Sequence, residues 1–113
     1  MASIQWQHLE SDRDLDQAIQ RSHELPVVLF KHSTRCSVSS FALRVFEQQY
    51  GYESGQIEPY FLDLIRHRDL SNRIAKELAI HHESPQMIVV KDGMAVYDTS
   101  HSQINAEVLK NYL

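Results

Sequence analysis

The chain of 113 residues lacks the features that mark several classes of protein. It has one cysteine, so it cannot form an internal disulfide, and in a reducing cytosol that thiol stays free. No apolar run approaches the roughly 20 residues of a membrane-spanning helix, and the first residues lack the basic and apolar regions of a signal peptide. The net charge of -4 gives no overall basic field, which nucleic-acid binding requires. We therefore expect a cytoplasmic protein that binds neither membranes nor nucleic acid.

The remaining composition is that of an ordinary globular protein. Apolar residues make up 42% and charged residues 23% of the chain, values that favour neither disorder nor a membrane class. The length matches one domain that can bury a core without disulfides or metal. We see no linker, internal repeat or low-complexity segment, and we expect a single domain over residues 1–113.

Predicted strands and helices alternate along the chain. Strands have period-two alternation or short apolar runs, and helices have apolar residues at a spacing of three and four. The predicted strands cover residues 4–9, 27–30 and 59–65, and a hairpin at 86–90 and 94–98 turns at Lys91-Asp92-Gly93. The predicted helices run from about 12 to 22, from the polar turn 32–35 to near Gly51, over 69–80, and over a last segment with Ile104, Val108 and Leu109 inward.

Four details of this pattern can be compared directly with a structure. The run 27–30 is apolar throughout, which predicts a strand buried on both faces at the centre of the sheet. Ser11 with Asp14 forms a start like a capping box for the first helix. The inward face of the second helix is predicted to consist of Val38, Phe41, Ala42, Val45 and Phe46. The inward face of the third helix is predicted to consist of Leu70, Ile74 and Leu78.

The order of the elements indicates an α/β fold. Units of strand, helix and strand need a parallel sheet centre, and the hairpin adds antiparallel strands. The prediction is a three-layer sandwich in which a mixed sheet of about five strands carries helices on both faces.

Cys36 is predicted to lie between a buried strand and the start of a helix. Backbone N–H groups of the first turn and the helix dipole favour a thiolate there, and Arg35, Lys31 and His32 are expected to add positive potential. The alternative is a cysteine buried as a small apolar residue. Polar neighbours and the absence of position 36 from the apolar face favour the reactive thiol.

Ser39 stands where a dithiol enzyme has its second cysteine, one helical turn after the first. A hydroxyl cannot resolve a mixed disulfide, but it can donate a hydrogen bond to a thiolate. We therefore predict a site that holds a mixed disulfide at Cys36 and needs an external low-molecular-weight thiol to release it. The alternative is that Ser39 supplies only the polarity common at helix starts.

Three segments carry a resemblance to a known family. The stretches KHSTRCSVS (31–39), DLIRHRDLSNRIA (63–75) and ESPQMIVVKDG (83–93) resemble the thioredoxin superfamily, and more narrowly the YtxJ-type monothiol bacilliredoxins. The resemblance covers nearly the whole chain, and its most specific parts are the Cys36-x-x-Ser39 motif and the Ser84-Pro85 step. The family pattern has proline where this chain has Ser37.

The resemblance implies a thioredoxin-like fold, a cis Ser84-Pro85 peptide bond that faces Cys36, and an oxidoreductase that removes bacillithiol from S-bacillithiolated proteins. Bacillithiol would be a co-substrate, with no tightly bound cofactor. Its malate carboxylates make Lys31, Arg35 and Arg44 sensible contacts. The implied catalytic residues are Cys36 and Ser39, and the implied substrate-binding residues are Thr34, Arg35, Ser37, Ser84, Pro85 and Lys31.

Other classes of function stay open at this point. One is a binding module without enzymatic activity, and another is an iron-sulfur carrier like the CGFS glutaredoxins, although Gly and Phe are missing between Cys36 and Ser39. His81 and His82 lack the spacing of a zinc site, so we expect no metal and interpret them as surface histidines near a loop.

Overall fold

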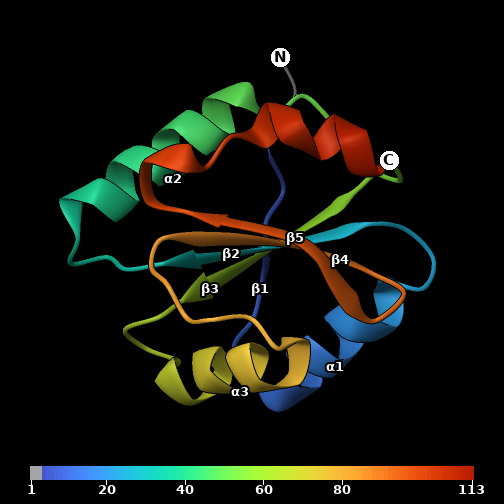
Figure 1. The fold of residues 1–113 in the computed structure, drawn as a ribbon, viewed down its shortest axis with the longest axis horizontal. Coiled ribbons are helices and arrows are strands. Elements are labelled where there is room, and N and C mark those ends of the chain that lie inside the picture. Colours follow the sequence, from blue (N-terminus) through green and yellow to red (C-terminus); the bar gives the residue numbers. More distant parts are fainter. Residues whose placement is uncertain (1–3) are drawn as a thin grey trace.

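The computed structural model describes residues 4–113, and its elements follow the predicted order (Figure 1). Five strands alternate with three α-helices, and two 3-10 helices close the chain. The strands are β1 (Gln7–His8), β2 (Val27–His32), β3 (Glu58–Asp63), β4 (Gln86–Lys91) and β5 (Met94–Ser100). The helices are α1 (Asp12–Arg21), α2 (Ser37–Gln49), α3 (Arg68–Leu78), η1 (His101–Gln103) and η2 (Ala106–Tyr112).

The strands form one mixed sheet in the order β1-β3-β2-β4-β5, so β2 is central as predicted. β3 pairs in parallel with β1 and β2, whereas β4 pairs antiparallel with β2 and β5. All six residues of β2 are buried, because layers cover both faces of the sheet. β2 is longer than predicted, since Lys31 and His32 continue it beyond the apolar run.

Helices cover both faces of the sheet (Figure 1). α1 and α3 lie on one face, and α2 and the C-terminal helical segment lie on the other. Each face has its own apolar core, one with Leu29 and Ile74, the other with Phe30 and Phe46. Consecutive residues of β2 thus point into opposite layers. None of the helices within residues 4–113 has the length and apolarity to cross a bilayer.

The inward face of α2 differs from the prediction. Ser39, Ala42 and Phe46 are buried, while Val38 is 51% and Phe41 62% exposed. The predicted face contained two of the correct residues but was rotated about the helix axis. Ser39 is polar and is absent from the predicted apolar face, yet it is buried with hydrogen-bond partners.

The inward face of α3 was predicted correctly, since Leu70, Ile74 and Leu78 are buried. The hairpin is also confirmed: Asp92 and Gly93 both have positive φ, as the tight turn between β4 and β5 requires.

The last helical segment is 3-10 rather than α-helical. Ala106, Leu109 and Tyr112 recur every third residue, so in a helix of three residues per turn they share one side. Ala106 and Leu109 are buried, and Tyr112 packs against Tyr97 with a centroid distance of 5.5 Å.

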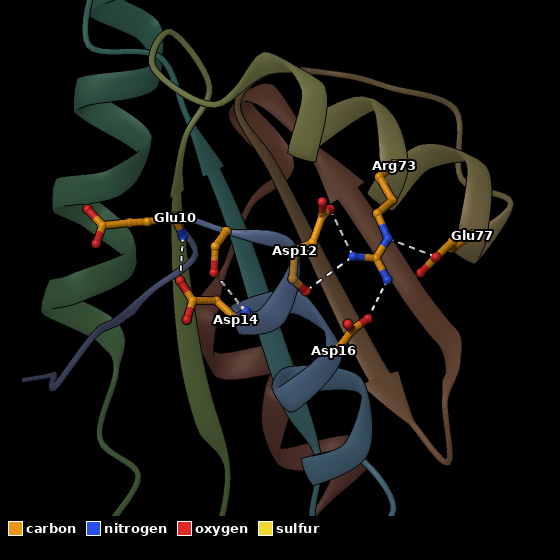
Figure 2. Close-up of polar contacts among 7 residues, drawn as sticks. Glu10, Asp12, Asp14, Asp16, Arg73 and Glu77 are labelled. Atoms are coloured by element: carbon orange, nitrogen blue, oxygen red, sulfur yellow. Dashed lines mark hydrogen bonds and ion pairs between the residues drawn. The ribbon is translucent and has the colours of Figure 1, made fainter.

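The first helix begins as predicted and is tied to α3 (Figure 2). The Asp14 backbone N–H donates to Ser11 Oγ at 3.2 Å, and the Asp14 carboxylate accepts from the Glu10 N–H at 2.9 Å. Farther along, Arg73 of α3 donates to Asp12 at 3.0 Å and to Asp16.

The N-terminal segment packs on α2 through the single tryptophan. The Trp6 ring stacks on Phe46 at a centroid distance of 5.7 Å and meets Phe30 edge-on. Its Nε1 donates to Glu47 of α2 at 2.7 Å. β1 itself is limited to Gln7–His8, shorter than the predicted 4–9.

Candidate active site

Cys36 is the N-cap residue of α2, four residues after the end of β2. Its backbone N–H donates to Ser33 O at 3.2 Å, and its carbonyl accepts from Ser40 N–H at 3.1 Å. The thiol is free and half-buried. The cysteine is therefore held by backbone bonds on both sides while the residue stays partly exposed.

The start of α2 supplies a favourable field for a thiolate. The first N–H groups of a helix have no partner within the helix, and the aligned peptide dipoles place partial positive charge at that end. The Cys36 side chain makes no capping hydrogen bond, and the first turn of α2 has no acidic residue that would oppose the field. The helix start thus has the arrangement on which the prediction of a reactive thiol depends.

Ser39 is fully buried, at 0% exposure, and its hydroxyl bonds away from the thiol. Ser33 N–H donates to Ser39 Oγ at 3.0 Å, and His32 Nδ1 lies 2.7 Å from the same oxygen. Within residues 4–113 no hydrogen bond joins Ser39 to Cys36. The predicted hydrogen bond from Ser39 to the sulfur is therefore replaced by bonds that hold β2 and α2 together.

His32 is a functional residue whose place the sequence pattern did not reveal. It is buried at the end of β2 rather than in a polar turn, with its ring tilted by 46° to the Phe61 ring at a centroid distance of 5.5 Å. Burial lowers the pKa of His32 below its ordinary value, although the carboxylates of Asp63 and Glu47 act in the opposite direction. A neutral His32 adds no positive potential, contrary to the prediction. The apolar run ends at Phe30, so the sequence carries no pattern that extends the buried strand to His32.

Lys31 does not belong to the thiol surface. Its side chain is 0% exposed and points to the α3 side of the sheet, where Nζ donates to Ser71 O at 3.3 Å and lies 3.2 Å from His82 Nδ1. Burial lowers the pKa of Lys31 to about 8. The predicted contact between Lys31 and substrate carboxylates is therefore wrong. Of the two histidines predicted at the surface, His81 is exposed, whereas His82 is half-buried. Burial and the charge of Lys31 lower the pKa of His82.

The predicted polar residues beside Cys36 are accessible. Thr34, Arg35 and Ser37 are exposed in the loop and first turn that hold the thiol. Arg44, about two turns along α2, is also exposed, and its guanidinium lies 5.9 Å from the centroid of the Phe41 ring. Of the three cations predicted to contact substrate carboxylates, Arg35 and Arg44 are therefore exposed and only Lys31 is buried.

The Ser84-Pro85 peptide bond is cis, as expected from the resemblance. Gln86 pairs with Lys31 in the antiparallel register, so the step before β4 lies beside the end of β2 that leads to Cys36. Pro85 is buried and its carbonyl accepts from His101 N–H at 3.1 Å. Ser84 Oγ is buried with no hydrogen-bond partner among the described residues.

No group of three metal-ligating side chains occurs in the part of the chain that the structure describes. The site therefore consists of one thiol, a helix start, a cis proline and exposed cations, an arrangement suited to thiol-disulfide exchange.

Comparisons with known proteins agree with this chemistry. The family model described as "Monothiol bacilliredoxin BrxC" matches residues 7–109. A solved structure titled a putative oxidoreductase with a thioredoxin fold is 32% identical with a TM-score of 0.78, covering 93% of this chain and 90% of that one. Thioredoxin from Malassezia sympodialis is 18% identical (TM-score 0.72, 98% and 90% covered), and oxidised thioredoxin O2 from Arabidopsis thaliana is 19% identical (TM-score 0.72, 96% and 95% covered). The latter two show the fold alone.

Proposed function

Because this chain belongs to the monothiol bacilliredoxin family, we propose that it removes bacillithiol from S-bacillithiolated proteins through a mixed disulfide at Cys36. The observation that carries the proposal is the single half-buried thiol at the start of α2, with a buried Ser39 in the place of a resolving cysteine. We further propose a cytoplasmic site of action, because a single unpaired thiol suits a reducing compartment.

The proposed reaction has two exchange steps. The Cys36 thiolate attacks the bacillithiol sulfur of the protein mixed disulfide, so that a new S–S bond forms at Cys36 and the substrate protein leaves as a thiolate. A free bacillithiol thiolate then attacks the adduct, which yields bacillithiol disulfide and regenerates the Cys36 thiolate. Each step breaks one disulfide and forms one. Over both steps, the one free bacillithiol thiolate supplies the electron pair with which the substrate protein leaves as a thiolate, and its sulfur ends in bacillithiol disulfide.

The exposed residues around Cys36 are the proposed contacts for the small thiol. Arg35 is the proposed partner of a malate carboxylate, and the exposed Thr34 and Ser37 are the proposed hydroxyl contacts. The cis Ser84-Pro85 step next to β2 is the proposed second wall. Lys31 has no part in this set because it is buried under the opposite face.

The test is transfer of the small thiol. A model protein with a bacillithiol mixed disulfide is incubated with this protein in the absence of free thiol, and intact mass is measured. We expect one bacillithiol adduct on Cys36 and reduced model protein, and Cys36→Ala must abolish both.

The same model protein with a glutathione mixed disulfide is the control for recognition. Glutathione lacks the sugar and malate groups, so we expect slower transfer. Equal rates would leave the exchange chemistry intact and remove the bacillithiol specificity. If neither disulfide reacts while Cys36 alkylates normally, the protein is not a thiol-transfer enzyme, and a binding module or a cluster carrier becomes the better explanation.

A further inference from the structure

Two large apolar side chains are exposed beside Cys36 without an internal reason. Val38 and Phe41 are 51% and 62% exposed, and they lie one helical turn apart on α2, two and five residues after the thiol. Because α2 already buries Ser39, Ala42 and Phe46, neither residue contributes to the core. Leaving such side chains in water forgoes the free energy of burying them, and exposed apolar patches commonly mark interaction sites.

The segment that carries Cys36 and the two exposed residues has no acidic side chain. Residues 31–46 contain no aspartate or glutamate, although the whole chain has 15 acidic residues and a net charge of -4, and the next acidic residue, Glu47, accepts a hydrogen bond from Trp6. Arg44 extends over the Phe41 ring, and Arg35 precedes the thiol. The arginine ion pairs of residues 4–113 involve Arg21 and Arg73. Arg35 and Arg44 are therefore free to pair with a carboxylate of another molecule.

We propose that Val38, Phe41 and Arg44, together with Arg35, form a docking surface for the polypeptide that carries the mixed disulfide. We call these four residues the α2 patch. The occupant is a substrate segment with an apolar side chain against Phe41 and an acidic side chain near Arg44 or Arg35. This inference rests on the proposed function and adds to it the partner class that the thiol site accepts.

The distances fit a polypeptide rather than the small thiol. At 1.5 Å per residue, Phe41 lies about 7.5 Å along the helix axis from Cys36. An extended substrate chain advances about 3.3 Å per residue, so a residue two or three positions from the modified cysteine reaches the patch. The small thiol carries no large apolar side chain for Val38 and Phe41 to bury. These two residues therefore favour protein disulfides, whereas Arg35 also serves the small thiol.

The experiment compares two substrates for three proteins. The substrates are a model protein whose bacillithiolated cysteine has phenylalanine and glutamate three residues away, and the disulfide of bacillithiol with free cysteine. The proteins are wild type, the Val38→Ser/Phe41→Ser variant, and a matched control, Met94→Ser/Val96→Ser. The control changes two exposed apolar residues of β5, which are 65% and 42% exposed.

We expect the Val38→Ser/Phe41→Ser variant to slow transfer from the model protein about tenfold and to leave the small disulfide unchanged. The control should leave both rates unchanged. Equal slowing of both substrates, or no slowing with the model protein, would overturn the docking surface. Arg44→Glu should slow the glutamate-bearing substrate and speed one with lysine at that position; the same effect on both would also contradict the proposal.

Two further outcomes are distinguishable. If a second copy of the chain covers the patch, sedimentation will show a dimer that Val38→Ser/Phe41→Ser dissociates, and the polypeptide proposal fails. If wild type transfers thiol from neither substrate, the proposed function fails, and docking is then decided by NMR titration of Cys36→Ala with the reduced model protein. Shifts of α2 amides support docking, and their absence overturns it.

Discussion

The Ser39 hydroxyl has one proton to donate, and its neighbours decide where that proton goes. Ser33 N–H donates to Ser39 Oγ at 3.0 Å, and His32 Nδ1 lies 2.7 Å from the same oxygen. Burial lowers the pKa of His32, which favours its neutral form. Both contacts of Ser39 are thus made away from the thiol, and the helix start is the main stabiliser of the reactive form.

The position of Ser39 gives a direct prediction. Cys36 is the N-cap and Ser39 the third residue of α2, so the variant Ser39→Cys places a second sulfur one turn from the first. We expect it to form an internal disulfide on oxidation, detected as a loss of two mass units and of two titratable thiols. It should also resolve its own adduct and no longer accumulate the small thiol.

The outcome that would contradict this prediction is an oxidised Ser39→Cys protein that retains two free thiols. Ser39→Ala is the matched control. It should keep the adduct chemistry and lose about 1–3 kcal/mol of unfolding free energy, because Ser33 N–H and His32 Nδ1 lose their partner.

Because Lys31 is buried, the free energy of unfolding should vary with pH in the alkaline range. Burial lowers its pKa from 10.5 to about 8, so between these values the unfolded chain binds more protons than the folded one. The free energy of unfolding should therefore rise as pH increases from 8 toward 10, by at most about 3 kcal/mol. Urea unfolding in the Cys36→Ala background, which removes the thiol titration, measures this rise.

The matched variant is Lys31→Met in the same background, which should have a flatter profile over this range. Above pH 10 the free energy of unfolding should fall again. Burial raises the pKa of Tyr50 and Tyr60 from 10.0 to about 12, so between these values the tyrosines of the unfolded chain lose protons that the folded protein keeps. A profile between pH 8 and 10 that is identical with and without Lys31 would show that this ammonium is not buried in solution.

At the scale of elements, one arginine joins two helices. Arg73 of α3 pairs with Asp12 at 3.0 Å, with Glu77 at 2.8 Å and with Asp16, and these carboxylates raise its pKa (Figure 2). Exposed pairs contribute little individually, but here one guanidinium serves three of them.

We expect Arg73→Ala to lower the unfolding free energy by about 1 kcal/mol in low salt and by less in 0.5 M NaCl, because salt screens exposed charges. Denaturant titrations at the two salt concentrations measure both values. Arg13→Ala is a control on α1, since Arg13 makes none of the ion pairs found in residues 4–113. If Arg73→Ala lowers the unfolding free energy by the same amount at both salt concentrations, the effect of Arg73 comes from packing and not from its ion pairs.

The elements show how far local patterns predict this structure. The face of α3 followed from its spacing because only one set of apolar residues was available there. On α2 two faces shared Ala42 and Phe46, and the pattern favoured the one with more apolar residues. What decided between them was the pair of hydrogen bonds that Ser39 makes with His32 of β2 and with Ser33 just after it, which the helix sequence alone does not contain.

The thiol site was predictable to a similar extent. Cys36 follows a buried strand and precedes a helix, so its position came from local order. Lys31 was misassigned because its partners, Ser71 and His82, lie 40 and 51 residues away along the chain. Charged residues are normally expected at the surface, and only the tertiary structure shows that this one is buried.

At the scale of the molecule, the two apolar cores share one sheet. Leu29 and Phe30 are neighbours on β2, yet each belongs to a different core. Because loss of β2 disrupts both layers, we expect residues 1–113 to unfold as one cooperative domain. Calorimetry should give equal calorimetric and van't Hoff enthalpies, whereas a ratio well above one would indicate two units.

Trp6 gives this arrangement an optical consequence. It is the only tryptophan, and its indole stacks on Phe46 and donates to Glu47, both on the helix that begins at Cys36. Its fluorescence emission therefore reports on α2 without an added dye. A shift of that helix during formation or release of a Cys36 adduct changes the emission, so a stopped-flow fluorimeter can follow the exchange in real time on the unlabelled protein.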